Sequence, residues 1–146
     1  MDHLDTVDMR RQHHAAEEMA ASIVALISGY RDEYDAIPIL RRLTKLNTLL
    51  RVHFAYEDTV LYPALIAGGD RAGALLALKF HVELGPLAMQ FEDFARRWSS
   101  PTTIASSFDE FREEAAAIFA TLGARIEREN DLLYPLAERT LSARAA

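Results

Sequence analysis

The chain has 146 residues, of which 50% are hydrophobic and 26% are charged, and it contains no cysteine. This size and composition predict one globular domain covering residues 1–146, and the lack of cysteine excludes disulfides, thiolate metal sites and thiol catalysis. The net charge of -6 argues against a nucleic-acid surface, because neutralising phosphates requires a basic face. We find neither a signal peptide pattern nor an apolar stretch as long as a membrane span, so we expect a cytoplasmic protein that binds no nucleic acid and no membrane.

Apolar residues recur at helical spacing in four segments, which are separated by glycine, proline, serine and aspartate. The first predicted helix covers about residues 7–30. The second begins after Asp35, a good N-cap residue, has Pro38 in its first turn and runs to about residue 66.

The third predicted helix follows Asp70 and ends near Trp98, with a kink where Gly85-Pro86 interrupts the backbone hydrogen bonds. The fourth covers about residues 104–134, and a short turn of helix follows Pro135. No segment alternates with period two. The pattern therefore predicts an all-α fold, an up-and-down antiparallel four-helix bundle.

A short motif occurs twice in the chain. Glu57-x-x-x-Leu61-Tyr62-Pro63 in the second predicted helix recurs as Glu129-x-x-x-Leu133-Tyr134-Pro135 in the fourth. The simplest interpretation of each proline is that it stops or bends its helix. We interpret the tyrosines as packing residues whose hydroxyl groups find a partner.

Two predicted helices carry long polar side chains on their apolar faces. His53 and Glu57 lie four residues apart on the inward face of the second helix, so the imidazole and the carboxylate can reach the same point. The inward face of the fourth helix carries Arg125 and Glu129 at the same spacing. An unpaired buried carboxylate costs several kcal/mol, roughly, so two inward carboxylates require a cation.

Periodicity distinguishes between two adjacent histidines on the first helix. From His13, apolar residues follow at the spacings of one buried stripe, whereas the corresponding positions from His14 include two glutamates. His13 is therefore the better inward candidate. On the third helix, His81 lies at the edge of the apolar stripe, where the Gly85-Pro86 kink could rotate it either way.

Imidazoles and carboxylates that converge in a bundle core suit a first-row transition metal such as iron, zinc, copper or manganese. Other familiar sites are excluded by spacing. The chain has no Glu-x-x-His of the ferritin-like di-iron proteins and no His-Glu-x-x-His of zinc proteases. It also lacks a glycine-rich phosphate loop and a Gly-x-Ser-x-Gly elbow.

The candidate residues resemble the pattern of the hemerythrin-like, or HHE, cation-binding family over nearly the whole chain. The matching positions are His13, His53-Phe54-Ala55-Tyr56-Glu57, Leu61-Tyr62-Pro63, His81, Glu129 and Leu133-Tyr134-Pro135. The resemblance implies a four-helix bundle that holds non-haem iron, commonly a di-iron pair bridged by two glutamates. It implies His13, His53, Glu57, His81 and Glu129 as metal ligands, and O2, NO or peroxide as the small partner.

One position departs from the family pattern. Arg125 stands where the family has its fourth-helix histidine, and a guanidinium cannot ligate a metal and carries a fixed positive charge. Three outcomes follow: a single ion held mainly by His13, His53 and Glu57; a distorted pair completed by water, Tyr56 or Glu18; or no metal, with Arg125 bridging Glu57 and Glu129 as a buried ion pair.

The sequence supports three functional hypotheses. The first is a small protein whose non-haem iron, one or two ions, reversibly binds or senses O2, NO or peroxide, rather than a dedicated enzyme. The second is a helical interaction or regulatory module of the same fold that has lost its metal. The third is an enzyme for a bulkier substrate, which requires an opening at the Gly85-Pro86 kink.

Overall fold

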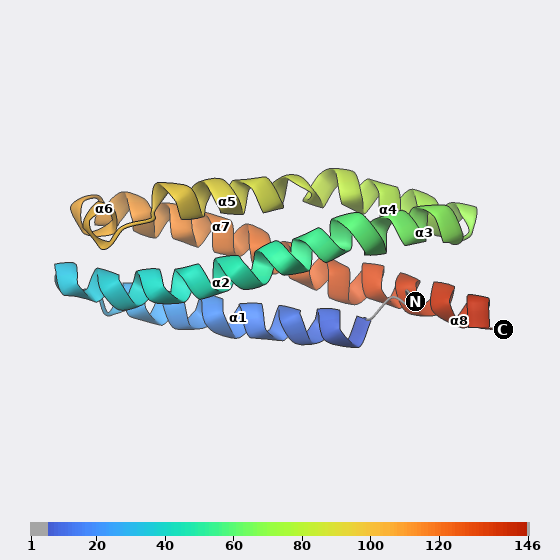
Figure 1. Ribbon diagram of the computed structural model, residues 1–146, viewed down its shortest axis with the longest axis horizontal. Coiled ribbons are helices and arrows are strands. Elements are labelled where there is room, and N and C mark those ends of the chain that lie inside the picture. Colours follow the sequence, from blue (N-terminus) through green and yellow to red (C-terminus); the bar gives the residue numbers. More distant parts are fainter. Residues whose placement is uncertain (1–5, 146) are drawn as a thin grey trace.

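The structure is a computed structural model that describes residues 6–145, with side chains described through Thr140. Within this range the chain forms helices and no strand, so the predicted all-α class is confirmed. The first helix, α1 (Thr6–Ser28), is followed by a short 3-10 turn, η1 (Glu33–Asp35), and by α2 (Ala36–Tyr56). In Figure 1, α1 and α2 lie side by side over most of their lengths, as their many contacts also show.

The second predicted helix continues past α2 through a different helical geometry. A π-helical segment, η2 (Glu57–Leu61), leads directly into α3 (Tyr62–Gly68). The Tyr62 N–H donates to the carbonyl of Glu57, five residues earlier, which is the hydrogen bond of a π-helix. Pro63 therefore follows a π-bulge and does not end the helix.

The remaining helices are α4 (Arg71–Leu84), α5 (Pro86–Arg97), α6 (Pro101–Ser106), α7 (Phe108–Arg128), the π-helical η3 (Glu129–Leu133) and α8 (Tyr134–Ala145). After α3 the chain runs back along the molecule through α4 and α5, and after α6 it reverses direction again through α7 and α8 (Figure 1). Helices α4 and α5 meet at the predicted Gly85-Pro86 junction. Each of the expected second, third and fourth helices is thus divided into shorter elements.

Two predicted limits of the fourth helix are wrong. It does not begin at Ile104, because Ser107 leaves helical geometry (φ -134°, ψ 46°) and separates the short α6 from α7. It also does not end near Tyr134 with only a short turn beyond Pro135. At η3 the Tyr134 N–H donates to the carbonyl of Glu129, five residues earlier, so Pro135 follows a π-bulge and α8 continues to Ala145.

The stretch Arg71–Arg97 is long and apolar enough to cross a membrane, by length and composition alone. Its most apolar 18-residue window has a mean hydropathy of 1.2, and 22% of that window is buried. This differs from our expectation that no stretch resembles a membrane span. A single helix of this kind is weak support for a membrane span, because core helices also satisfy these criteria. The expected lack of membrane binding stays a prediction.

The buried apolar residues form two clusters along the length of the molecule. The larger contains side chains of α1, α2, α5, α6 and α7, and the smaller contains side chains near the start of α1 and of η2, α3, α4, η3 and α8. Along α1, Met9 belongs to the smaller cluster and Ala16 to the larger, with His13 between them. The candidate polar residues therefore lie between two apolar cores.

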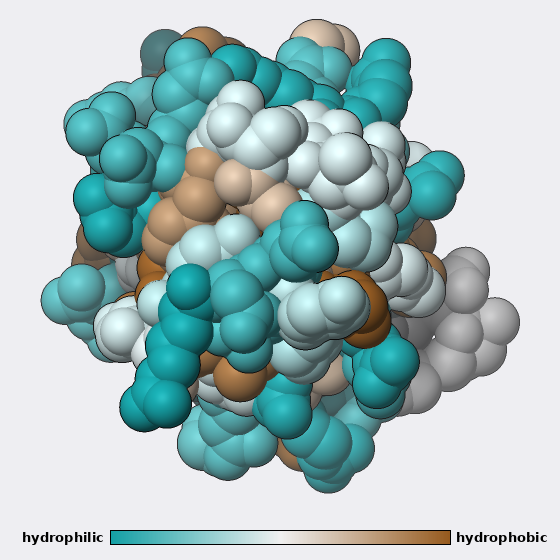
Figure 2. All heavy atoms as spheres, turned by 90° about the vertical axis from the view of Figure 1, so that its left-hand side faces the viewer, coloured by the Kyte–Doolittle hydropathy of each residue, from teal (hydrophilic) through white to brown (hydrophobic). Residues whose placement is uncertain are grey.

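Figure 2 looks onto the end of the molecule where α1 leads into α2 and where α6 lies. Hydrophilic side chains cover most of this face, with a few hydrophobic ones between them. The aromatic part of the larger core lies toward this end, and its centre is Phe111, which is fully buried. The ring of Phe111 contacts those of Trp98 and Phe94 at centroid distances of 5.3 and 5.8 Å.

Replacing Phe111 by alanine removes this contact and leaves a cavity. We expect Phe111→Ala to lower the free energy of unfolding by about 3–5 kcal/mol, measured by urea denaturation followed by circular dichroism. Tyr34→Ala is the control, because Tyr34 is 70% exposed and its loss is expected to change stability by less than about 0.5 kcal/mol. Equal effects of the two substitutions would contradict this placement of the core.

Candidate metal centre

The register of α1 decides which of its histidines faces the interior. His13 is buried between Met9 and Ala16, whereas the side chain of His14 is 75% exposed and pairs at 2.9 Å with Glu18, which is 70% exposed. The structure thus places the two histidines as the helical periodicity predicts. It also places Glu18 on the surface, so Glu18 does not complete the cluster.

The two copies of the repeated motif coincide with the two π-helical segments. Glu57 is the first residue of η2 and Glu129 is the first residue of η3, and both side chains are fully buried. A π-bulge widens one turn of a helix, and such bulges are frequent at functional sites. The repeat therefore marks two equivalent places where a carboxylate enters the core.

Four predicted site residues meet in one buried cluster. The His13 Nε2 atom lies 3.1 Å from Glu129 Oε1, and the His53 Nε2 atom lies 3.2 Å from Glu57 Oε2. The two imidazole rings are 4.6 Å apart. One ligand atom from each residue lies within 4.8 Å of all the others.

An amide side chain forms a hydrogen bond with the Nδ1 atom of each imidazole, on the side of the ring away from the carboxylates. Gln12 Oε1 lies 2.7 Å from His53 Nδ1, and Asn130 Oδ1 lies 2.8 Å from His13 Nδ1. An amide oxygen only accepts, so each Nδ1 donates a proton, and each Nε2 faces a carboxylate oxygen. Sequence reasoning missed both amides. Their only signal is that each is the chain neighbour of a candidate ligand, Gln12 of His13 and Asn130 of Glu129.

The tyrosines of the repeated motif connect the two halves crosswise. Tyr62 of the first copy donates to Glu129 Oε2 at 3.0 Å, and Tyr134 of the second donates to Glu57 Oε2 at 2.7 Å. The Tyr134 hydroxyl also lies 3.0 Å from His13 Nε2. Both hydroxyls find partners, as interpreted from the sequence, and those partners are the buried carboxylates themselves.

Arg125 completes the cluster from α7. Its Nε donates to Glu129 Oε2 at 3.1 Å and one terminal nitrogen donates to Glu57 Oε1 at 2.9 Å. The other terminal nitrogen donates to the carbonyl oxygen of Leu84 at 2.9 Å, and the guanidinium lies 4.3 Å above the ring of Phe54. This buried bridge between the two glutamates is the ion pair anticipated from the sequence.

A family model described as the hemerythrin HHE cation binding domain matches residues 4–137, which is most of the chain. The chain belongs to the hemerythrin family. Comparisons with curated proteins and with solved structures find no match. The cation binding named for this family agrees with a buried cluster of two imidazoles and two carboxylates, the donor types that bind transition metals.

Not every residue of the hemerythrin-like pattern enters the cluster. The side chain of His81 is 39% exposed, and its Nδ1 lies 3.8 Å from Asp58 Oδ1. Neither of these two atoms has a hydrogen-bond partner. His81 therefore lies outside the group formed by His13, His53, Glu57 and Glu129, and Tyr56 is half-buried beside the smaller apolar core.

The charges in the hemerythrin-family cluster are unequal. Burial raises the pKa of Glu57, but the neighbouring His53 and Arg125 outweigh it and lower this pKa to about 2. Burial and the charge of Glu57 raise the pKa of Glu129. Burial opposes the charge of Arg125, yet the adjacent Glu129 and Glu57 raise its pKa. Glu57 and Arg125 therefore form a charged pair at neutral pH.

The residues of the cluster fit one metal ion. Donors on opposite sides of a transition metal lie about 4.2 Å apart when each bond is about 2.1 Å, so a spread of 4.8 Å approaches one coordination sphere. The buried His53 Nε2 atom has no hydrogen-bond partner. An imidazole nitrogen that faces a carboxylate requires either a proton or a metal cation between the two groups. The metal-binding roles of His13, His53, Glu57 and Glu129 stay predictions.

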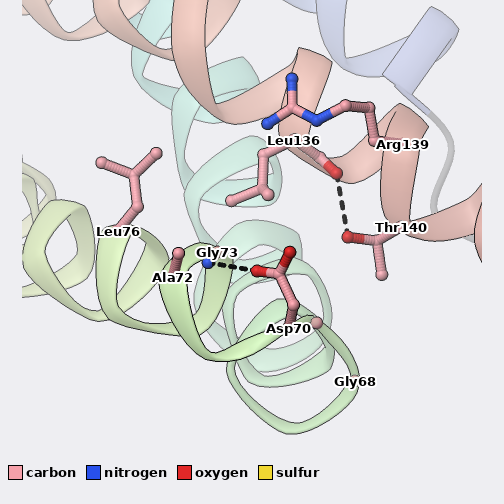
Figure 3. Close-up of a pocket in the computed structure, with 9 residues that line it drawn as sticks. Gly68, Asp70, Ala72, Gly73, Leu76, Leu136, Arg139 and Thr140 are labelled. Carbon is pink, nitrogen blue, oxygen red and sulfur yellow. Dashed lines mark hydrogen bonds between the residues drawn. The ribbon is translucent and has the colours of Figure 1, made fainter.

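A surface pocket lies apart from the cluster. Figure 3 shows it between the start of α4 and α8, and its volume is about 600 Å³. Its polar side chains are largely occupied, because Asp70 accepts from the Gly73 N–H and Thr140 donates to the Leu136 carbonyl. None of its lining residues belongs to the cluster, so its size does not make it the functional site.

The bridge made by Arg125 predicts a large loss of stability when its charge is removed. We expect Arg125→Ala to lower the free energy of unfolding of the metal-free protein by about 3–5 kcal/mol, because two buried carboxylates lose their compensating charge. The measurement is urea denaturation. Arg128→Ala is the matched control, since Arg128 pairs with Glu83 in a half-exposed position and should cost at most about 1 kcal/mol. An unchanged midpoint for Arg125→Ala would reject the bridge.

Proposed function

We propose that this hemerythrin-family protein holds non-haem iron in its core and reversibly binds or senses O2, NO or peroxide there. His13, His53, Glu57 and Glu129 supply the ligands. In this proposal the helices form an up-and-down antiparallel four-helix bundle, whose arms are α1, α2 with α3, α4 with α5, and α7 with α8. Bound iron would supply an open coordination position for the small ligand.

The single observation that carries the proposal is the unpartnered Nε2 atom of His53. This atom is buried, its imidazole is oriented by Gln12 through Nδ1, and a carboxylate oxygen of Glu57 lies 3.2 Å away. A buried nitrogen in this position requires either an added proton, which would pair it with Glu57, or a bound metal cation. An outer hydrogen bond from the second ring nitrogen is also the usual arrangement for a metal-bound histidine.

The surroundings of the cluster favour a small ligand over a bulky substrate. A surface cavity of about 380 Å³ opens at the Gly85 kink and reaches Phe54 and Asp58. Phe54 is buried, and the guanidinium of Arg125 lies directly against its ring. This aromatic wall separates the cavity from the cluster, so a diatomic molecule or peroxide suits the site better than a large substrate.

A second candidate function rests on the bridge of Arg125. Because one guanidinium pairs with both Glu57 and Glu129, the carboxylates have a compensating charge without any metal. In this alternative the chain is a metal-free helical interaction or regulatory module of the hemerythrin family. Iron analysis separates the two candidates.

Removing one imidazole tests the iron site directly. We expect His53→Ala, produced in iron-replete medium, to retain less than about a tenth of the iron of the unaltered protein. Elemental analysis and visible absorption of the purified protein measure this loss. His81→Ala and His14→Ala serve as matched controls and should keep their iron, because neither residue belongs to the cluster.

NO added to the reduced, iron-loaded protein is expected to change its visible absorption and to leave His53→Ala unchanged. Colourless, iron-free protein from iron-replete medium would instead support the metal-free module. Iron retained by His53→Ala but lost by His81→Ala would contradict the ligand set.

A further inference from the structure

Each buried carboxylate divides its two oxygen atoms between different partners. Glu57 turns Oε2 toward His53 and Oε1 toward Arg125, at 3.2 and 2.9 Å. Glu129 turns Oε1 toward His13 and Oε2 toward Arg125, both at 3.1 Å. The two glutamates thus bridge two half-sites, one lined by imidazoles and one filled by a guanidinium. A carboxylate that joins two cations uses its oxygens in this way.

The guanidinium is held in the second half-site by more than the carboxylates. At the α4–α5 junction the Ala88 N–H, which would reach the Leu84 carbonyl in a regular α-helix, donates to the Gly85 carbonyl. The carbonyl oxygen of Leu84 is therefore available, and it accepts from Arg125 at 2.9 Å. A Cβ atom at Gly85 would lie 2.7 Å from the carbonyl oxygen of His81, so this junction requires glycine.

No nitrogen ligand serves this second half-site among the described residues. His81 is the nearest candidate from the sequence, but it is partly exposed and faces Asp58. Arg125 itself has no lone pair to donate to a metal and keeps its charge at any ordinary pH. The half-site therefore contains a permanent cation, and the carboxylate and carbonyl oxygens that line it already accept hydrogen bonds from that cation.

We propose that the Arg125 guanidinium takes the place of a second metal ion, so that the cluster binds one metal ion per chain and never a pair. This inference rests on the proposed function, because it assumes that the imidazole half-site binds metal. The charges favour one ion over two. With both carboxylates ionised and Arg125 present, one divalent ion leaves the buried cluster with one excess positive charge, whereas two divalent ions would leave three.

The test is a titration of metal-free protein with Co(II), followed by calorimetry, by visible absorption and by elemental analysis after gel filtration. The unaltered protein should bind one ion per chain. Arg125→His exchanges the fixed charge for a nitrogen ligand and should bind two. Arg128→His adds a histidine on the half-exposed side of the same helix and should still bind one.

A second pair of variants keeps the test decisive if Arg125→His does not fold. Arg125→Lys retains the positive charge and Arg125→Gln removes it. Because a fixed charge beside the imidazole half-site repels the incoming ion, Arg125→Gln should bind its first Co(II) at least about tenfold more tightly than Arg125→Lys. Equal affinities would overturn the proposal.

The stoichiometry separates this inference from the function on which it rests. Two ions per chain in the unaltered protein would overturn the role of Arg125 and leave the metal site standing. No ion would reject the metal site, and the inference with it. One ion in the unaltered protein and one in folded Arg125→His would show that the guanidinium does not exclude the second ion.

Discussion

Two carboxylates buried in the middle of a helical molecule are the constraint on which the rest of the structure depends. Glu57 and Glu129 are fully shielded from solvent, so water cannot stabilise their charges. The polar groups around the two carboxylates stabilise these charges in place of water. They are a guanidinium, two tyrosine hydroxyls and two imidazoles. The apolar cores on both sides contain no other such group of metal-binding side chains among the described residues.

The repeated motif explains how two helices deliver these carboxylates in equivalent ways. In each copy the glutamate opens a π-helical segment and the proline follows it, so the proline occupies the place where the backbone bonding already shifts. Each copy also provides a tyrosine to the glutamate of the other. The two copies of the motif are therefore linked by reciprocal hydrogen bonds, and neither proline ends its helix.

The sequence predicted the inward orientation of a polar residue where that residue lies within a strong apolar stripe of its helix. His13, His53, Glu57 and Glu129 could be placed inward because large apolar residues flank them at helical spacing. His81 could not, because it precedes the Gly85-Pro86 junction, where a straight periodicity no longer holds. The helix beyond Pro135 was predicted as a short turn only, and its full length was missed because a π-bulge leaves no signal in composition. Gln12 and Asn130 were missed because amides are common on helix surfaces and become meaningful only beside a histidine.

The bridge of Arg125 also connects the two candidate functions. A site whose carboxylates depended on metal alone would lose its structure when the metal left, because binding and folding free energies are then the same quantity. Here one of the two negative charges is compensated by the chain itself. The helices can therefore remain assembled without metal while the imidazole half-site keeps its unpartnered nitrogen. In the proposed function, an ion that enters or leaves would therefore change the charge of the core without being needed to hold the core together.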